Sequence, residues 1–467
     1  MSNDVAIPVL QTHDVPRELI ARYDRPGPRY TSYPTAPEWT SLGSLDAAAA
    51  FERMAADPRP ISIYVHLPFC ERMCLFCGCN VIVAKNHEKV PRYLEALERE
   101  IAMVRALTGP KQVVQLHLGG GTPTFLTPDE LKRLVRALWG AFERLPQAEV
   151  GIEVDPMVTT RAHLTAVREL GFNRMSMGVQ DFRDDVQEVT DRKQPDAKST
   201  EVFELGRELG FASINVDLMY GLPRQTPQHL AHSARRAIDL GADRIAVFGY
   251  AHVPWMKPHQ KKLEPFGIPT AAERWQMFNA ARSTLMSAGY RAIGFDHFAK
   301  PTDELAIAFK QRRLNRNFQG YTVLEPTHLV GLGVSAISDA GGAFLQNAHR
   351  LSDYYKAIEA RGFATEKGHV LDAEDVLRRA VIVDLMCNLY VDFEAVERRF
   401  DIKFEEHFAK ELVALGPLEA DGLVIRGARH LEITERGRVF TRNAAMPFDA
   451  YLGRSKGDDK PRFSRTV

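Results

Sequence analysis

The sequence predicts an α/β fold in which a partial or full (β/α) barrel is followed by a smaller, mainly helical C-terminal domain. Apolar runs of strand length alternate with amphipathic runs of helical length from about residue 61 to about residue 250. Repeated strand–helix units of this length favour a parallel sheet, and six or more of them curl the sheet into a barrel or part of one. From about Leu371 the alternation stops, and short amphipathic helices follow one another.

Residues that commonly begin or end helices mark the limits of several expected helices. Thr127, Pro128 and Glu130 combine an N-cap, a proline at the first helical position and a capping-box glutamate. Glycines are expected to end three of the helices, at Gly171, Gly210 and Gly241. The strands are expected at Ile61–Phe69, Val113–Leu118, Val150–Asp155, Arg174–Val179, Ile214–Met219 and Ile245–Tyr250. The helices between them are expected at His87–Leu107, Pro128–Phe142, Arg161–Leu170, Ser199–Leu209 and Pro227–Asp239.

Three segments are expected: a proline-punctuated N-terminal arm over 1–55, a barrel domain over 56–365 and a C-terminal domain over 370–467. In the last of these, amphipathic helices precede a run over 422–440 that is typical of a small β-hairpin with a glycine turn. Helices followed by a hairpin indicate a winged-helix-like unit, for which DNA binding and a packing or lid role are the two interpretations. No basic recognition helix is evident, so the packing role is favoured.

Charge and hydropathy exclude several classes of partner. The chain carries 60 basic and 60 acidic side chains, so no net field favours nucleic acid or a membrane surface. No apolar run is long enough to span a bilayer, and the first residues are acidic and interrupted by proline, unlike a secretory signal. A cytoplasmic protein is therefore expected, and we expect it to be a monomer.

Three cysteines with the spacing C-x3-C-x2-C are the most informative residues of the chain: Cys70, Cys74 and Cys77. A [4Fe–4S] cluster normally takes four cysteine ligands, so three would leave one iron open for chemistry. A structural zinc site and a disulfide knot fit less well, because no second ligand pair follows and the chain has only five cysteines. Cys79 is a candidate fourth ligand that we expect to point away, and Cys387 lies in an apolar helical run as a small buried hydrophobe.

Glycine and polar residues gather where the expected strands end. In parallel α/β folds the carboxyl ends of the strands meet at one edge, and ligands bind there. The cysteine loop follows the first strand, and three glycines and a threonine at 119–122 follow the second. The later strands end at or near Glu153, Asp155, Gln180, Asp217, Tyr250, Ala251 and His252. The sequence therefore predicts one ligand site at this edge.

Five motifs, in this order, resemble the radical S-adenosylmethionine (SAM) superfamily: CERMCLFCGCN, GGGTPTFL, IEVDP, MGVQDF and DLMYGLPRQTP. Two further segments, RYTSYPTA at 29–36 and NFQGYT at 317–322, are similar to the family of oxygen-independent coproporphyrinogen III oxidases, also called coproporphyrinogen dehydrogenases. The resemblance extends from the N-terminal arm to the end of the chain. It implies a barrel of radical SAM type, with a [4Fe–4S] cluster and SAM as cofactors, the latter as two molecules.

The resemblance also implies an activity, that of an oxidoreductase in porphyrin and haem biosynthesis. Two propionate side chains of coproporphyrinogen III would be decarboxylated oxidatively to vinyl groups, giving protoporphyrinogen IX, while SAM is cleaved to methionine and 5′-deoxyadenosine. An electron donor and an electron acceptor are required, and the sequence identifies neither. The alternatives are another radical SAM enzyme acting on tetrapyrroles, a haem-binding chaperone and a zinc-stabilised binding protein.

Site residues follow from the same resemblance. The metal ligands would be the three cysteines, and no catalytic side chain is implied beyond the cluster and SAM. SAM contacts would come from Tyr64, Phe76, Gly120, Gly121, Thr122, Glu153, Gln180, Arg192, Asp217, Ala251 and Ile337. The carboxylates of the substrate favour arginine partners, for which the candidates, each otherwise a solvated charge, are Arg22, Arg25, Arg29, Arg312, Arg313 and Arg316. His66 and His252 are candidates for proton or hydrogen-bond partners, or are structural.

Overall fold

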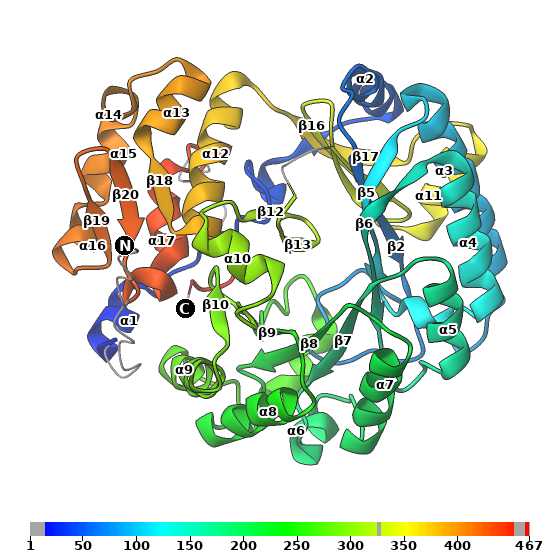
Figure 1. The fold of residues 1–467 in the computed structure, drawn as a ribbon, viewed down its shortest axis with the longest axis horizontal. Helices are drawn as coiled ribbons and strands as arrows, with labels where there is room; N and C mark the ends of the chain where they lie inside the picture. The colour runs from blue at the N-terminus through cyan, green and yellow to red at the C-terminus, as the bar shows by residue number, and fades with distance from the viewer. Residues whose placement is uncertain (1–14, 325–327, 453–462, 467) are drawn as a thin grey trace, which may run out of the picture.

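A computed structural model of the protein describes residues 15–324, 328–452 and 463–466. A curved sheet with helices on its outer side forms most of the molecule, and a smaller unit of short helices lies at one side of it (Figure 1). The first 14 residues of the expected N-terminal arm, and residues 453–462 of the expected C-terminal domain, lie outside the described ranges.

Six parallel strands form the centre of the sheet, as the sequence predicts. Hydrogen-bonded in this order, they are β2 (Ile61–Leu67), β5 (Gln112–Gly120), β6 (Glu143–Val154), β7 (Arg174–Gln180), β8 (Ser213–Tyr220) and β9 (Arg244–Gly249). The sheet ends at two strands, β1 (Thr40–Ser41) and β10 (Arg291–Ile293), which do not pair with each other in the described part of the chain. The α/β fold class is therefore confirmed, and the barrel is partial.

Helices between these strands cover the outer face of the sheet (Figure 1). They are α3 (Val90–Thr108), α4 (Pro128–Ala141), α5 (Arg161–Glu169), α6 (Asp184–Val189), α7 (Asp196–Glu208), α8 (Pro227–Asp239) and α9 (Ala271–Ser287). In α4, Leu131, Leu134, Val135 and Leu138 are buried, the spacing of one apolar helix face.

The expected helix start and stop signals are present, although α3 begins at Val90 rather than His87 and α7 at Asp196 rather than Ser199. The Thr127 hydroxyl accepts from the Glu130 amide at 3.2 Å, and the Glu130 carboxylate accepts from the Thr127 amide at 2.7 Å. This reciprocal pair is the capping box that the sequence predicts. The three helix-ending glycines adopt positive φ, where a side chain would be strained: Gly171 at 95°, Gly210 at 79° and Gly241 at 82°.

Short strands that the sequence analysis did not identify extend the sheet on both sides. Next to β2 lie β14 (Leu329–Leu332), β15 (Ile337–Ala340), β16 (Ala343–Asn347) and β17 (Thr365–Val370), and next to β9 lies β11 (His297–Ala299). A separate hairpin pairs β12 (Asn315–Asn317) with β13 (Gly320–Thr322). α2 (Ser44–Ala55), α10 (Glu304–Lys310), α11 (Leu351–Glu359) and η3 (Pro258–Phe266) complete this part. Runs of three to six residues lack the length from which periodicity is recognised.

The C-terminal unit has its own apolar core, distinct from that of the barrel. Its helices are α12 (Ala373–Asn388), α13 (Phe393–Phe400), α14 (Phe404–His407), α15 (Ala409–Ala414), α16 (Gly416–Ala420) and α17 (Thr441–Ala445). A three-stranded sheet contains β18 (Tyr390–Asp392), β19 (Val424–Arg426) and β20 (His430–Ile433), so the expected hairpin is present.

The N-terminal arm connects the two cores. Helix α1 (Arg17–Tyr23) buries Leu19, Ile20 and Tyr23 in the C-terminal core, and the Tyr23 ring lies 5.3 Å from that of Phe440. Helix α2 instead packs into the barrel core. No helix in the described ranges combines the length and apolarity needed to cross a membrane.

Candidate active site

The cysteine loop leaves the end of β2 and packs against the neighbouring strand ends. Cys74 is 9% exposed, and Cys70 and Cys77 are half-buried. Burial raises the pKa of Cys70 to about 11, and the nearby thiols of Cys77 and Cys74 add to that rise. The three thiols therefore lie near one another. Cys79 is exposed as a residue, but its thiol interacts with that of Cys77, so it does not point away from the other cysteines as expected. The Thr122 hydroxyl lies 3.4 Å from the Cys70 sulfur, which places the end of β5 beside the loop.

Among the described residues, no three Cys, His, Asp or Glu side chains converge on one point as the ligands of a single metal ion do. A [4Fe–4S] cluster does not need that convergence, because each thiolate binds a different iron. The donor set of three thiols on one short loop therefore suits a cluster.

Polar residues after the sixth strand hold the cysteine loop from the other side, and sequence reasoning missed them. The Lys257 ammonium donates to the Cys79 carbonyl at 2.8 Å, and a His259 ring nitrogen lies 2.9 Å from the Cys77 carbonyl. The fully buried Gln260 amide donates to the carbonyls of Phe76 at 3.1 Å and Ala251 at 3.2 Å. The available signal was the polar run KPHQ at 257–260.

Gln260 thus brings together two residues that the sequence placed at the SAM site. The Phe76 side chain is 8% exposed and lies in a small apolar cluster with Tyr250 and Leu263. Ala251 follows the end of β9.

Ile337 lies in β15, and its backbone packs against Gly331 of β14. Gly331 is in turn the residue that pairs with Tyr64 in the neighbouring strand β2. Ile337 therefore lies two strands away from Tyr64.

Glu153 is held at the centre of the strand ends. Its carboxylate accepts from the Gly120 amide at 3.1 Å and lies 3.2 Å from a His117 ring nitrogen. Burial opposes ionisation of Glu153, but these two partners outweigh it and lower the pKa. A Cβ at Gly119 would lie 2.7 Å from a Glu153 carboxylate oxygen, so only glycine permits this approach.

Tyr64 and His66 continue the same polar cluster along β2. The Tyr64 hydroxyl lies 3.1 Å from one His66 ring nitrogen, and the other ring nitrogen lies 2.9 Å from the Asn80 carbonyl. A Cβ at Gly120, where φ is 108°, would lie 2.3 Å from the His66 ring. The glycines of the GGGT motif are therefore needed because Glu153 and His66 pack directly on the backbone of β5.

Gln180 and Arg192 carry buried polar atoms that lack partners among the described residues, namely the Gln180 carbonyl oxygen and the Arg192 Nε. The remaining Arg192 nitrogens donate to the Gly178 carbonyl at 2.6 Å and to the Cys74 sulfur at 3.4 Å. Asp155 lies 3.6 Å from the same guanidinium. Unpartnered buried polar atoms are costly in a folded protein. A polar ligand beside Cys74 would satisfy them, so the residues present fit a cluster with bound SAM.

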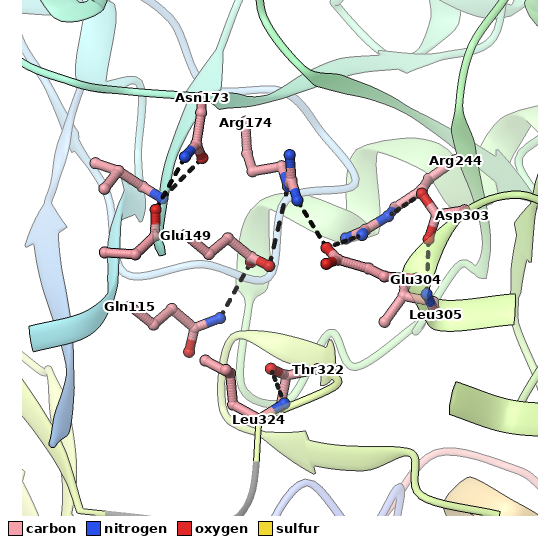
Figure 2. A network of polar contacts seen from close by, with 12 residues as sticks. Gln115, Glu149, Asn173, Arg174, Arg244, Asp303, Glu304, Leu305, Thr322 and Leu324 are labelled. Atoms are coloured by element: carbon pink, nitrogen blue, oxygen red, sulfur yellow. Dashed lines mark hydrogen bonds and ion pairs between the residues drawn. The ribbon is translucent and has the colours of Figure 1, made fainter. Parts of the chain in front are cut away.

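A cavity of about 220 Å³ lies inside the barrel, with Glu153, Asp217, His297 and Tyr321 in its lining. Charged side chains near the amino-terminal ends of the strands line its other end, which we call its floor, and belong to a network of polar contacts (Figure 2). The Glu304 carboxylate accepts from Arg174 at 2.8 Å and from Arg244 at 2.7 Å. Gln115 donates to Glu149 at 3.2 Å on the same floor. The cavity lining therefore extends from Glu153 near the carboxyl ends of the strands to Arg174 and Arg244 near their amino ends.

Asp217 faces this cavity from the middle of β8. Its carboxylate accepts from the Asn215 amide at 2.7 Å and from the Ser176 hydroxyl at 3.2 Å. Burial raises the pKa of Asp217 to about 6. The side chain nevertheless retains partial exposure, because it borders the cavity.

We expect Asp217→Asn to remove a pH dependence of stability. Between roughly pH 4 and pH 6 the folded protein keeps a proton on Asp217 that the unfolded chain has released, so the free energy of unfolding falls as pH rises through this range. The loss is at most about 3 kcal/mol, less where cavity water solvates the carboxylate. Urea unfolding without SAM should show the variant more stable than wild type near pH 7 and equal to it near pH 4. An equal difference at both pH values would contradict this.

The six candidate arginines do not form one site. Arg22 pairs with Asp421 at 2.8 Å on the surface, and Arg312 stacks 3.4 Å from the Tyr390 ring centroid. Arg25 and Arg313 are exposed. Arg29 and Arg316 alone among the six point toward the barrel: Arg29 donates to the Gly249 carbonyl at 2.8 Å, and Arg316 lies 5.2 Å from the Tyr321 ring centroid. His252 lies 3.2 Å from Glu264, away from the cavity lining.

Comparison with known proteins identifies the family of this chain. The pattern of the radical SAM superfamily matches residues 64–237, and that of the HemN C-terminal domain matches residues 371–440. The oxygen-independent coproporphyrinogen III oxidase of Salmonella typhimurium is 44% identical over 450 residues, which cover 96% of this chain and 98% of the relative. The chain belongs to the oxygen-independent coproporphyrinogen III oxidase family. The Escherichia coli member is 42% identical over 450 residues, with the same coverage.

A solved structure agrees with this assignment. Coproporphyrinogen III oxidase (HemN) from Escherichia coli, described as a radical SAM enzyme, is 41% identical, with a TM-score of 0.90 over 95% of this chain and 100% of that one. This member of the oxygen-independent coproporphyrinogen III oxidase family therefore has the radical SAM fold that its motifs predicted. It is an oxidoreductase whose cofactors are a [4Fe–4S] cluster and SAM.

Proposed function

We propose that this protein converts coproporphyrinogen III into protoporphyrinogen IX by oxidative decarboxylation of two propionate side chains. At each propionate a hydrogen atom leaves the β-carbon, then carbon dioxide and one electron leave, and a vinyl group remains. The observation that carries the proposal is the group of three neighbouring thiols at the strand ends, with the unpartnered Arg192 Nε beside Cys74 and the Glu153 carboxylate on the lining of the barrel cavity. The reaction needs a one-electron donor for the cluster and a one-electron acceptor for the substrate.

When bound, the cluster and SAM supply the radical that removes the hydrogen atom. Cys70, Cys74 and Cys77 would hold the cluster, and the buried Arg192 would offset the negative charge of the thiolates. Tyr64, Gly120, Gly121, Thr122, Glu153, Gln180, Asp217, Ala251 and Ile337, with Phe76, would hold SAM, in two copies. The charged floor at Arg174, Arg244 and Glu304 would keep bulk water out of the cavity from below. Action as a cytoplasmic monomer remains a prediction from the sequence.

Glu153→Gln tests the SAM-binding role directly. The amide keeps the shape of the side chain but removes the negative charge that would accept from a SAM ammonium or ribose hydroxyl. We expect SAM affinity to fall about 10- to 100-fold, because hydrogen bonds to charged groups contribute about 1.5–3 kcal/mol. Anaerobic equilibrium dialysis of the cluster-loaded protein measures it. Glu143→Gln, at the exposed start of the same strand, is the matched control and should bind SAM normally. Unchanged affinity in Glu153→Gln would exclude the role.

The reaction itself is tested by anaerobic incubation of the cluster-loaded protein with dithionite, SAM and coproporphyrinogen III. Chromatography should show protoporphyrin after oxidation of the product, with 5′-deoxyadenosine formed alongside it. Tight haem binding without any consumption of coproporphyrinogen would instead indicate a haem-binding chaperone. Modification of another tetrapyrrole without vinyl formation would indicate a different radical SAM activity.

A further inference from the structure

A second, smaller cavity lies where several distant segments of the chain meet. Its volume is about 60 Å³, and we call it the arginine cavity after Arg29, Arg274 and Arg442 in its lining. Arg29 comes from the N-terminal arm, Arg274 from α9 and Arg442 from α17 in the C-terminal unit. The ends of β8 and β9, at Tyr220 and Gly249, complete the wall. Because so many segments contribute to it, this site forms only when the whole chain is folded.

None of these three arginines forms an ion pair with the residues that the structure describes. Arg442 is 7% exposed, yet it donates to backbone carbonyls, among them Pro28 at 2.8 Å. Arg29 likewise donates to the Gly249 carbonyl at 2.8 Å. The Nε of Arg274 is buried without a hydrogen-bond partner in the described ranges, and its guanidinium lies 5.8 Å from the Tyr220 ring centroid. Buried guanidinium groups are usually matched by carboxylates, so this arrangement lacks a counter-charge.

The local charge balance is positive. Asp296 is the only carboxylate in the lining of the arginine cavity, which also contains the guanidinium groups of Arg29, Arg274 and Arg442. A fourth arginine of the lining, Arg465, is already paired with Asp24. Burial lowers the pKa of Arg442 to about 9, and the charge of Arg29 contributes to that shift. The cluster therefore costs free energy as it stands, and an anion in the cavity would recover it.

The arginine cavity and the barrel cavity share one wall. Asp296 lines the first and His297 the second, and a ring nitrogen of His297 lies 2.6 Å from the Asp296 carboxylate. Phe295 and Tyr321 form the next part of this wall, with ring centroids 6.5 Å apart. The two cavities therefore lie on opposite sides of this wall.

We propose that the arginine cavity binds a carboxylate of the tetrapyrrole, on a propionate arm other than the one that reacts. This assignment rests on the proposed function, because it takes coproporphyrinogen as the substrate. The lining of the cavity suits both the carboxylate and the methylene groups of a propionate arm. Guanidinium groups bind carboxylates in bidentate fashion, and the aromatic rings of Tyr220, Phe278 and Phe295 suit the two methylene groups. The cavity would thereby fix which propionate faces the cluster.

Fluorescence titration with coproporphyrin III, the stable oxidised form of the substrate, tests the site in the anaerobic cluster-loaded protein. We expect Arg274→Gln to weaken binding at least about tenfold, the loss of one charge-assisted contact. Arg274→Lys keeps the charge without the planar fork, so its affinity should be intermediate. Arg235→Gln, an exposed arginine on α8, is the matched control and should bind as wild type does. Coproporphyrin III tetraamide, which has no carboxylates, should bind wild type and Arg274→Gln equally.

Arg29→Gln is a second, independent variant in case Arg274→Gln does not fold, and circular dichroism checks both. Wild-type affinity for coproporphyrin III in folded Arg274→Gln or Arg29→Gln would overturn the site, while turnover by the wild-type protein would leave the proposed function intact. Conversely, weakened binding in these variants would support the site even if the wild-type protein failed to convert coproporphyrinogen III.

Discussion

Cys74→Ala is expected to abolish the cluster and the reaction together. Cys74 is the most buried of the three candidate ligands, at 9% exposure, and its sulfur accepts from Arg192 at 3.4 Å. Two thiolates cannot hold a [4Fe–4S] cluster in place of three, and without the cluster no electron reaches SAM. Iron and sulfide per chain should fall to background, and product formation should fall at least about a thousandfold, which corresponds to about 4 kcal/mol of activation free energy.

Two cysteine variants act as matched controls for this experiment. Cys387 is fully buried in α12 and lies outside the candidate site, so Cys387→Ala should retain iron, sulfide and activity. Cys79 is exposed, and Cys79→Ala should also retain the cluster if three cysteines are sufficient. Product formation by Cys74→Ala at the wild-type rate would exclude the proposed mechanism. Loss of the cluster in Cys79→Ala would instead show four cysteine ligands and no open iron.

Glu100→Leu is expected to cause the largest loss of stability. Glu100, in α3, is 2% exposed, and its carboxylate accepts three hydrogen bonds. The donors are the Gly333 amide at 2.7 Å, the Asn347 amide at 2.7 Å and the Tyr354 hydroxyl at 2.8 Å. Leucine of similar volume leaves the Gly333 amide and the Tyr354 hydroxyl buried without this acceptor, and leaves the Asn347 amide only its bond to the Gly333 carbonyl at 2.9 Å. We expect the free energy of unfolding to fall by about 3–5 kcal/mol.

Thermal unfolding followed by circular dichroism measures this effect, and a drop of roughly 5–10 °C in the midpoint is expected. Glu95→Leu, on the exposed face of the same helix, is the matched control and should leave the midpoint within about 1–2 °C. Because Glu100 ties α3 to the loop before β15 and to β16, Glu100→Leu should also weaken SAM binding through displacement of Ile337. A midpoint equal to that of wild type would show that water satisfies the three donors.

Much of the barrel could be predicted because its signals are local. The strands and helices from β2 to β9 can be recognised by the periodicity of apolar residues over ten to twenty positions and by capping residues such as Thr127 and Gly171. Glu153 and the cysteine loop were found for the same reason, since each lies directly at a strand end. The strands β14 to β17 were not predicted because they are only four to six residues long, and because β14, β15 and β16 follow one another as antiparallel neighbours without helices between them.

The candidate site was predicted in part for a similar physical reason. Motif residues such as Glu153 and Gln180 lie at one edge because parallel strands bring their carboxyl ends together there. The contacts of Gln260 with Phe76 join residues 184 positions apart, and no local pattern reports such a pairing. Likewise, the sequence could nominate Arg29 and Arg316, but it could not find Arg274 or exclude Arg22.

The sequence by itself determined the βα alternation, the edge of the sheet where ligands bind and the thiols that suit a cluster, because short-range spacing fixes all three. Only the tertiary structure decided which side chains face one another across the cavity and where positive charge lacks a partner. The arginine cavity unites Arg29 with Arg442, which are 413 positions apart in the chain. These two arginines come together only because the barrel core, the C-terminal core and the N-terminal arm pack against one another. That packing is a property of the folded chain and cannot be recognised in any one segment.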